Sequence, residues 1–256
     1  EDCEVFQCFT RPPQGGPAPK LTDEIVANFK SEMARCRQAN FYIHTPYYLN
    51  FASLKPAIRG ASWRVCREEL ERGSLLGAKY VMTHLGSHSE QTLEEGLEKV
   101  IEAVSKILDD YHGATELLLE ISAGSGNVIG DTFEEIGKVL RSLPPHLRAS
   151  VGVCFDTCHA FASGYDFRTP TQAKALLEKF DTAIGLEWLK LTHVNDSKFD
   201  LGAKRDRHEH IGKGFIGKAG LTSLLTTPVF SKIDWILETE TDDRLADLAA
   251  LKTIRS

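Results

Sequence analysis

Short apolar runs rich in β-branched and aromatic residues alternate along this chain with longer stretches whose apolar residues recur at helical spacing. The short runs predict strands, and the longer stretches predict helices. We expect strands at residues 4–9, 41–45, 80–85, 116–121, 150–157, 189–195 and 235–239. We expect helices at residues 22–38, 62–76, 93–111, 132–141, 171–186, 218–225 and 243–254.

This alternation is typical of parallel strands joined by crossover helices. Runs such as LLLE and VGVCF have no polar alternation, which indicates strands buried on both faces. A TIM-type (β/α) barrel fits the pattern and the length of 256 residues, so we expect a single barrel domain over residues 1–256. Seven β/α units are visible. The first strand and helix of the usual eight are missing, either because the sequence is a fragment or because the barrel has seven strands.

Composition indicates an ordinary globular protein, with 42% hydrophobic and 26% charged residues. No apolar run reaches the roughly 18 residues that span a bilayer. The start of the chain has no basic region followed by an apolar segment, so we expect a cytoplasmic protein without membrane contact. We also expect a monomer. The six cysteines lack CxxC spacing, which indicates reduced and mostly buried thiols rather than disulfides.

Potential metal ligands lie at the ends of six successive predicted strands. They are His44, His84, Glu120, Asp156, His193 and Glu238. In a (β/α) barrel the C-terminal strand ends surround one mouth, where the active site lies, so these distant residues are expected to share a pocket. The motifs FDTCHAF and KRDRHEH add three further candidates, namely His159, Asp206 and His208.

Nine His, Asp and Glu donors are too many for one tetrahedral ion. Three ions with about three protein ligands each account for them if one carboxylate bridges two ions. Imidazole combined with carboxylate favours Zn²⁺, with Mn²⁺ or Fe²⁺ as alternatives, over Ca²⁺ or Mg²⁺. The formal net charge of −6 speaks against a nucleic-acid partner. Three divalent cations would offset that charge and concentrate positive charge in one cleft.

Seven motifs along the chain carry a resemblance to a known family. They are HTPYYLN, HLGSH, LEISAGSG, VGVCFDTCHAFASGYDFRTP, HVNDSK, KRDRHEHIGKGFIG and ILET. In this order they resemble the endonuclease IV family, which comprises metal-dependent apurinic/apyrimidinic endonucleases of DNA base-excision repair. The resemblance extends over residues 9–240.

The resemblance implies a trinuclear zinc centre. The first zinc would be held by His44 and His84, with Glu120 bridging it to the second. The residues that complete the second zinc site would be Asp156, His193 and Glu238. The third zinc would be held by His159, Asp206 and His208. The implied activity is hydrolysis of double-stranded DNA on the 5′ side of an abasic site, together with removal of 3′-blocking groups, with Glu120 as the catalytic residue beside the nucleophile.

The resemblance also implies DNA contacts. Tyr47 matches a position that enters the DNA stack, Tyr48 follows it, and Arg207 is a candidate phosphate contact. An enzyme acting on an abasic nucleotide must take it out of the helix, which costs least where the base is already absent. Wedge side chains usually offset that cost.

Two departures from the family pattern concern DNA binding and the bridging carboxylate. The loop after the first strand reads TRPPQGGPAPK, where Arg11, Gln14 and Lys20 are the candidates to reach a groove. Ile121 follows Glu120 where the family has a small or polar residue. We hypothesise weaker or differently shaped DNA binding with the cleavage chemistry kept.

Two other functional classes remain open at this point. A sugar isomerase or epimerase on a related barrel would use two or fewer divalent ions and would not require the Asp206 to His208 motif. A catalytically inert nucleic-acid-binding remnant is the other alternative. A metal count separates the first class from the nuclease, and an incision assay separates the second.

Overall fold

The structure is a computed structural model that describes residues 3–256, and this part of the chain divides into two compact units. Unit 1 contains residues 3–119 and 139–152, and unit 2 contains residues 120–138 and 153–256. Each unit is described by itself. The single domain expected from the sequence therefore stays a prediction.

The strands of unit 1 pair in parallel and in chain order. They are β1 (Val5–Cys8), β2 (Asn40–His44), β3 (Tyr80–Thr83) and β4 (Glu116–Glu120), whose last residue belongs to unit 2. Strands β2 and β3 are almost wholly buried, as the near-continuous apolar runs predict. Tyr42 and Tyr80 stack across this pair with ring centroids 5.8 Å apart.

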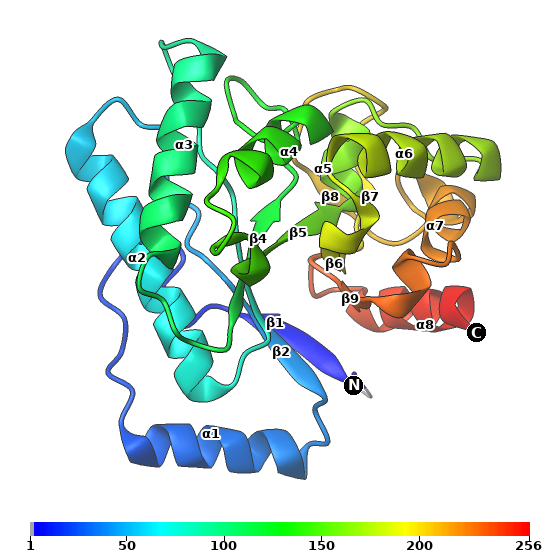
Figure 1. Ribbon diagram of the computed structural model, residues 1–256. Coiled ribbons are helices and arrows are strands. Elements are labelled where there is room, and N and C mark those ends of the chain that lie inside the picture. The colour runs from blue at the N-terminus through cyan, green and yellow to red at the C-terminus, as the bar shows by residue number, and fades with distance from the viewer. Residues whose placement is uncertain (1–2) are drawn as a thin grey trace. The chain divides into compact units, whose positions relative to one another are not determined.

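Three helices of unit 1 connect these strands. They are α1 (Asp23–Arg35), α2 (Pro56–Leu76) and α3 (Leu93–Leu108), of which α2 and α3 lie side by side (Figure 1). Helix α3 starts with a capping box in which Thr92 accepts from the Glu95 amide and Glu95 reaches back to Thr92. Helix α2 begins six residues before the predicted start at residue 62, because Pro56 occupies its first turn, where the fixed proline φ suits a helix.

Unit 2 contains a second set of parallel strands and a small antiparallel ladder. The parallel strands are β5 (Val151–Asp156), whose first two residues belong to unit 1, β6 (Leu189–His193) and β9 (Asp234–Ile236). The ladder joins β7 (Asp196–Ser197) to β8 (His208–Glu209). The helices are α5 (Thr157–Ala162), α6 (Pro170–Ala183), α7 (Gly217–Leu225), α8 (Arg244–Arg255) and α4 (Phe133–Ser142), which ends in unit 1. Short 3₁₀ turns occur at η1 (Arg148–Ser150, unit 1), η2 (Leu186–Trp188) and η3 (Phe230–Lys232).

The core of unit 2 is aromatic. Phe133 stacks on Tyr165 with ring centroids 3.9 Å apart, and it contacts Phe180 edge-on at 5.2 Å. Phe155 on β5 meets Phe230 edge-on at 5.2 Å. The Tyr165 hydroxyl accepts a hydrogen bond of 2.9 Å from the Phe133 amide at the start of α4, so the phenol also satisfies a helix-terminal donor.

Every predicted strand and helix has a counterpart in the described chain, with ends displaced by a few residues. The sequence interpretation missed α5 and the β7–β8 ladder, and it extended the fifth strand one residue too far, to residue 157. Over residues 3–256, no helix is both long enough and apolar enough to cross a membrane.

A buried ion network fixes the loop after β1 onto α2. Arg11 donates through Nε to Glu69 Oε1 at 2.6 Å and pairs with Glu68 at 2.7 Å. The Thr10 hydroxyl also donates to Glu69, and Arg72 donates to the Thr10 carbonyl at 2.9 Å. Burial lowers the pKa of the Arg11 guanidinium, but Glu68 and Glu69 outweigh it and raise this pKa above its ordinary value. Arg11 therefore has a structural role.

Replacing Glu69 with Ala should lower the free energy of unfolding by about 3–5 kcal/mol, because it removes the buried carboxylate beside the Arg11 guanidinium and leaves only the half-exposed Glu68 to balance that charge. Urea denaturation followed by circular dichroism measures this change. Glu32→Ala, which removes an exposed partner of Arg35 on α1, is the control and should leave the unfolding midpoint almost unchanged. Equal midpoints for the two variants would contradict the assigned role of Glu69.

Candidate metal centre

Unit 1 brings two predicted ligands together. His44 is the last residue of β2, His84 directly follows β3, and their ring centroids lie 5.2 Å apart. A hydrogen bond of 2.8 Å between the hydroxyls of Thr45 and Thr83 ties these strand ends to each other. His44 Nδ1 lies 2.6 Å from the Thr45 carbonyl oxygen, which can only accept, so Nδ1 carries the proton and Nε2 carries the lone pair that a metal needs.

Unit 2 gathers four predicted ligands into a first cluster. His193 Nδ1 lies 2.8 Å from Glu120 Oε1, 3.2 Å from Glu238 Oε2 and 3.8 Å from Asp156 Oδ2. Glu120, Asp156 and His193 are fully buried. The ligand atoms of the four residues lie within 4.8 Å of one another, which is the arrangement of donors around a single cation.

A second cluster in unit 2 contains the other three predicted ligands. Asp206 Oδ1 lies 3.2 Å from His159 Nε2 and 3.3 Å from His208 Nε2, and the two Nε2 atoms are 3.5 Å apart. His159 Nδ1 donates to the carbonyl of Ile121 at 2.9 Å, which turns Nε2 toward Asp206. The Asp206 side chain is half-exposed, so this cluster can be reached from solvent.

Local structure explains why these side chains converge. Asp156 ends β5 and is the N-cap of α5, where its Oδ1 accepts from the His159 amide at 2.8 Å. One helical turn then places His159 beside Asp156. The β7–β8 ladder pairs Ser197 with His208, which brings this ligand of the second cluster back to the segment that follows β6.

Taken together, the two clusters of unit 2 contain four carboxylates and three imidazoles. Burial lowers the pKa of His159, but Asp156, Asp206 and Glu120 outweigh it and raise this pKa to about 10. Burial also lowers the pKa of His208, yet Asp206 and Asp156 raise it to about 8. Burial raises the pKa of Asp206, but His159 and His208 bring it far below its usual range. Both clusters therefore favour positive charge, and their nitrogen and oxygen donors fit a divalent ion such as Zn²⁺.

Asn195 orients ligands and was missed by the sequence interpretation. Its Nδ2 donates to Asp156 Oδ2 at 2.7 Å, and its Oδ1 accepts from the Glu238 amide at 2.9 Å. Its backbone exchanges hydrogen bonds with the Thr157 hydroxyl at 2.6 and 2.8 Å. The available signal was its place two residues after His193 in HVNDSK. Where a residue orients metal ligands in this way, its loss typically weakens metal binding by about 10- to 100-fold.

Asp196 organises the loop that follows β8. Its buried carboxylate accepts from the amides of Ser197 at 2.8 Å, Ile216 at 2.9 Å and Gly212 at 3.0 Å. Gly214 packs so closely that an added Cβ would lie 2.3 Å from the Ser197 carbonyl oxygen, so a larger residue does not fit there. The IGKG segment is therefore built around this aspartate.

Cys154 and Cys158 lie among the ligands, but their thiols suit packing better than ligation. Their sulfurs lie within 4.8 Å of ligand atoms, Cys154 near Glu120 and His193, and Cys158 near Asp156 and His208. Burial raises the pKa of Cys154 to about 12 and also raises that of Cys158, so both thiols are protonated at neutral pH when no ion is bound. The Cys158 thiol instead donates to the Arg207 carbonyl at 3.6 Å.

The candidate DNA contacts differ in exposure. Tyr47 is 63% exposed and lies edge-on to Phe9, with ring centroids 5.4 Å apart, while Tyr48 is 43% exposed. Arg207 is exposed and donates to the Asp206 carbonyl at 2.6 Å. Arg11 was expected among the groove candidates of its loop, and this was wrong, because it is only 6% exposed and paired with Glu69.

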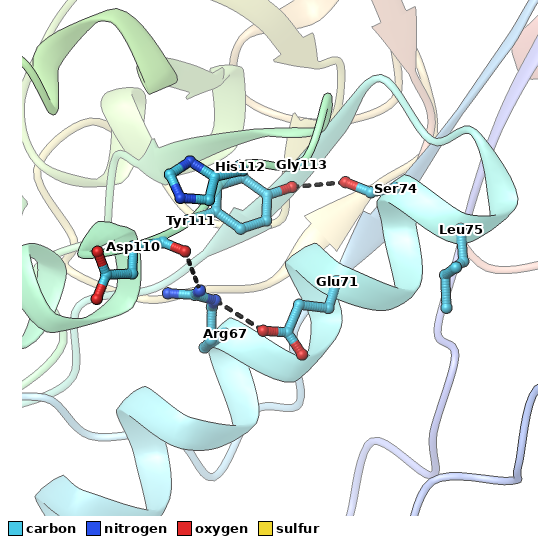
Figure 2. A pocket seen from close by; sticks show the side chains of 8 residues that line it. All are labelled: Arg67, Glu71, Ser74, Leu75, Asp110, Tyr111, His112 and Gly113. Atoms are coloured by element: carbon cyan, nitrogen blue, oxygen red, sulfur yellow. Dashed lines mark hydrogen bonds and ion pairs between the residues drawn. The ribbon is translucent and has the colours of Figure 1, made fainter.

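A separate pocket of unit 1, about 430 Å³ in volume, contains none of the predicted ligands. Figure 2 shows its polar groups engaged with one another: Arg67 reaches Glu71 at 2.9 Å and the Asp110 carbonyl at 2.9 Å, and the Tyr111 hydroxyl lies 2.7 Å from Ser74 Oγ. These contacts join α2 to the end of α3. The pocket is therefore a structural junction between α2 and the segment that follows α3.

Comparisons with known proteins place these clusters in a family context. Residues 2–255 match a family model described as a xylose isomerase-like TIM barrel. A probable endonuclease 4 of Methanosphaerula palustris is 38% identical over 257 residues, covering 99% of this chain and 89% of the relative. A probable endonuclease 4 of Nitrosopumilus maritimus is 37% identical over 253 residues, covering 98% and 90%.

Solved structures agree with this match. Endonuclease IV from Thermus thermophilus has a TM-score of 0.84 at 30% identity, covering 98% of this chain and 88% of that one. A D-tagatose 3-epimerase-like protein has a TM-score of 0.75 at 18% identity, covering 99% and 89%, which is a likeness of fold alone. The TIM-type barrel expected from the sequence is confirmed.

Thiol titration of the native protein should distinguish buried from exposed cysteines. We expect Cys36, which is exposed, to react rapidly with a disulfide reagent at pH 8, while the buried thiols of Cys66, Cys154 and Cys158 react only after unfolding. Burial raises the pKa of each of these three thiols, so almost none is thiolate at pH 8. Mass spectrometry of labelled peptides identifies the modified positions. Rapid native labelling of Cys154 or Cys158 would mean that the thiols are accessible and ionised.

Proposed function

Because this chain belongs to the endonuclease IV family, we propose that it is a DNA-repair hydrolase that cleaves the phosphodiester bond on the 5′ side of an abasic site and also removes 3′-blocking groups, in base-excision repair. The observation that carries the proposal is the convergence of seven sequence-predicted ligands into two clusters in unit 2. Relatives that are 37–38% identical over nearly the whole chain and are named probable endonuclease 4 support it.

We propose that the chain holds three zinc ions, with manganese or iron as alternatives at one position. One ion is assigned to His159, Asp206 and His208. A second is assigned to Glu120, Asp156, His193 and Glu238. The family resemblance of the sequence assigns the third to His44 and His84, with Glu120 shared. When bound, such ions activate water at neutral pH and neutralise the charge of a phosphate.

The residues of the chain have distinct roles in this proposal. Glu120 is the proposed catalytic residue, because its buried carboxylate lies in the first cluster, 2.8 Å from His193, where a bound ion would activate water. Asn195 holds Asp156 and Glu238 in place through its amide. Water adds to phosphorus as the bond to the 3′ oxygen breaks, which leaves a 3′-hydroxyl and a 5′-deoxyribose phosphate.

DNA engagement is assigned to exposed side chains. Tyr47 and Tyr48 are proposed to stack against the DNA beside the lesion, since aromatic rings stabilise unstacked nucleotides. Arg207 is proposed to contact a phosphate next to the second cluster, which contains Asp206. A double-stranded DNA substrate implies that the protein acts inside the cell. The expected monomer remains a prediction.

A sugar epimerase is the second candidate, since an 18% identical epimerase-like protein shares the fold. Such an enzyme has no need for the cluster of His159, Asp206 and His208, so a count of bound ions separates the two. We therefore propose elemental analysis of the purified chain together with incision of a duplex that carries one abasic analogue, with and without chelator. About three zinc per chain and chelator-sensitive incision support the nuclease. Zinc without incision would leave the epimerase or an inert DNA-binding protein.

Replacing Glu120 with Gln should preserve the fold and lower kcat for abasic-site incision by several orders of magnitude, because it removes a charge from the position of the nucleophile. Single-turnover incision assays measure the loss, and circular dichroism checks the fold. Glu116→Gln, at the other end of β4, is the control and should retain activity. Wild-type turnover in Glu120→Gln would remove Glu120 from the catalytic role.

Replacing Tyr47 with Ala should weaken binding of an abasic duplex by about 1–3 kcal/mol, the usual contribution of a base stacked on an aromatic ring. Zinc content should stay at the wild-type level, since the Tyr47 side chain is mostly exposed. Fluorescence anisotropy measures binding. The control is Leu75→Ala, which removes an exposed apolar side chain at a different place, on α2. Loss of zinc in Tyr47→Ala would show a role in the metal centre instead.

A further inference from the structure

A buried carboxylate on the C-terminal helix links two loops of unit 2. Asp247, in the first turn of α8, is only 2% exposed. Its Oδ1 accepts from the Ile211 amide at 2.8 Å. Its Oδ2 accepts from His210 Nδ1 at 2.8 Å and from the Thr239 hydroxyl at 2.7 Å. Three hydrogen bonds satisfy this buried charge, and they come from two separate segments of the chain.

Each of these two segments carries a proposed ion ligand one or two residues before the first residue that Asp247 contacts. Thr239 directly follows Glu238, which belongs to the first cluster. His210 and Ile211 follow His208, which belongs to the second cluster. The segments also approach each other, since His208 Nδ1 lies 3.4 Å from the Glu238 carbonyl oxygen.

We infer that Asp247 is a positioning residue. It fixes the segment that carries His208 relative to the segment that carries Glu238, and thereby couples the geometry of the two clusters. The inference rests on the proposed function of these clusters as ion sites. Outer contacts strengthen the arrangement: His210 Nε2 lies 3.1 Å from Asp242, and Lys213 pairs with Asp243. The loop after β8 is thus fastened to the start of α8 at several points, of which Asp247 is the buried one.

The direct test is hydrogen–deuterium exchange of the purified protein and its Asp247→Ala variant. Exchange should rise in both segments, residues 208–213 and 237–241, because both lose their anchor. Leu251→Ala is the matched control, since it removes a buried side chain from the same helix, and that side chain has no polar atom with which to hydrogen-bond either loop. It should raise exchange in α8 and leave both segments unchanged. Unaltered exchange of the two segments in Asp247→Ala would overturn the inference.

Zinc retention gives a second readout. Competition with a chromophoric chelator should show two ions held about 10- to 100-fold more weakly in Asp247→Ala, as expected when contacts to ligand segments are removed. Leu251→Ala should retain wild-type affinity. Thr239→Val removes only the hydrogen bond between the Glu238 segment and Asp247, so it should lower the affinity for one ion. Asp247→Asn, which keeps the shape and one acceptor oxygen, replaces the alanine variant if that variant does not fold.

The outcomes separate this inference from the proposed nuclease activity. Raised exchange in both segments, with no incision by the wild-type protein, would retain the positioning role and discard the endonuclease. If the wild-type protein incises the duplex, and Asp247→Ala shows unaltered exchange and zinc affinity, the endonuclease is retained and the positioning role is discarded.

Discussion

Charge balance in a buried space is the constraint on which the rest of unit 2 depends. Glu120 and Asp156 are fully enclosed, and burying a carboxylate is costly unless a positive group compensates it. His193 lies 2.8 Å from Glu120 and supplies part of this compensation. The excess of carboxylates over imidazoles explains why divalent cations suit the site. The surrounding amides and the short β7–β8 ladder then fix the positions of the side chains.

The fold was readable from the sequence where local pattern and local chemistry agree. The apolar run VGVCF predicts a buried strand, which is β5, and the apolar residues at helical spacing after residue 93 predict α3. The ladder of Asp196–Ser197 with His208–Glu209 could not be predicted, because two residues per strand carry no periodicity. Helix α5 was hidden for a related reason: its six residues follow β5 without a turn between them.

Six of the nine proposed ligands were predicted from their place at strand ends, where chain position alone implies a shared edge, and the other three came from two short motifs. The residues that hold them were not. Asn195 and Asp247 resemble ordinary turn or helix-start residues, and only tertiary contacts reveal their partners. Arg11 was misjudged for the same reason, since Glu69, which buries it, comes from a helix far along the chain.

The double duty of Asp156 has a consequence for reading this family's evolution. One oxygen of this side chain caps a helix while the other faces a proposed ligand cluster, so a diverged relative that lost catalysis would still be stabilised by a capping residue such as Asp, Asn, Ser or Thr at this position. The Asp206 side chain is half-exposed, faces His159 and His208, and does not cap a helix. Among diverged relatives, an aspartate at position 206 should therefore indicate retained activity, whereas an aspartate at position 156 should not.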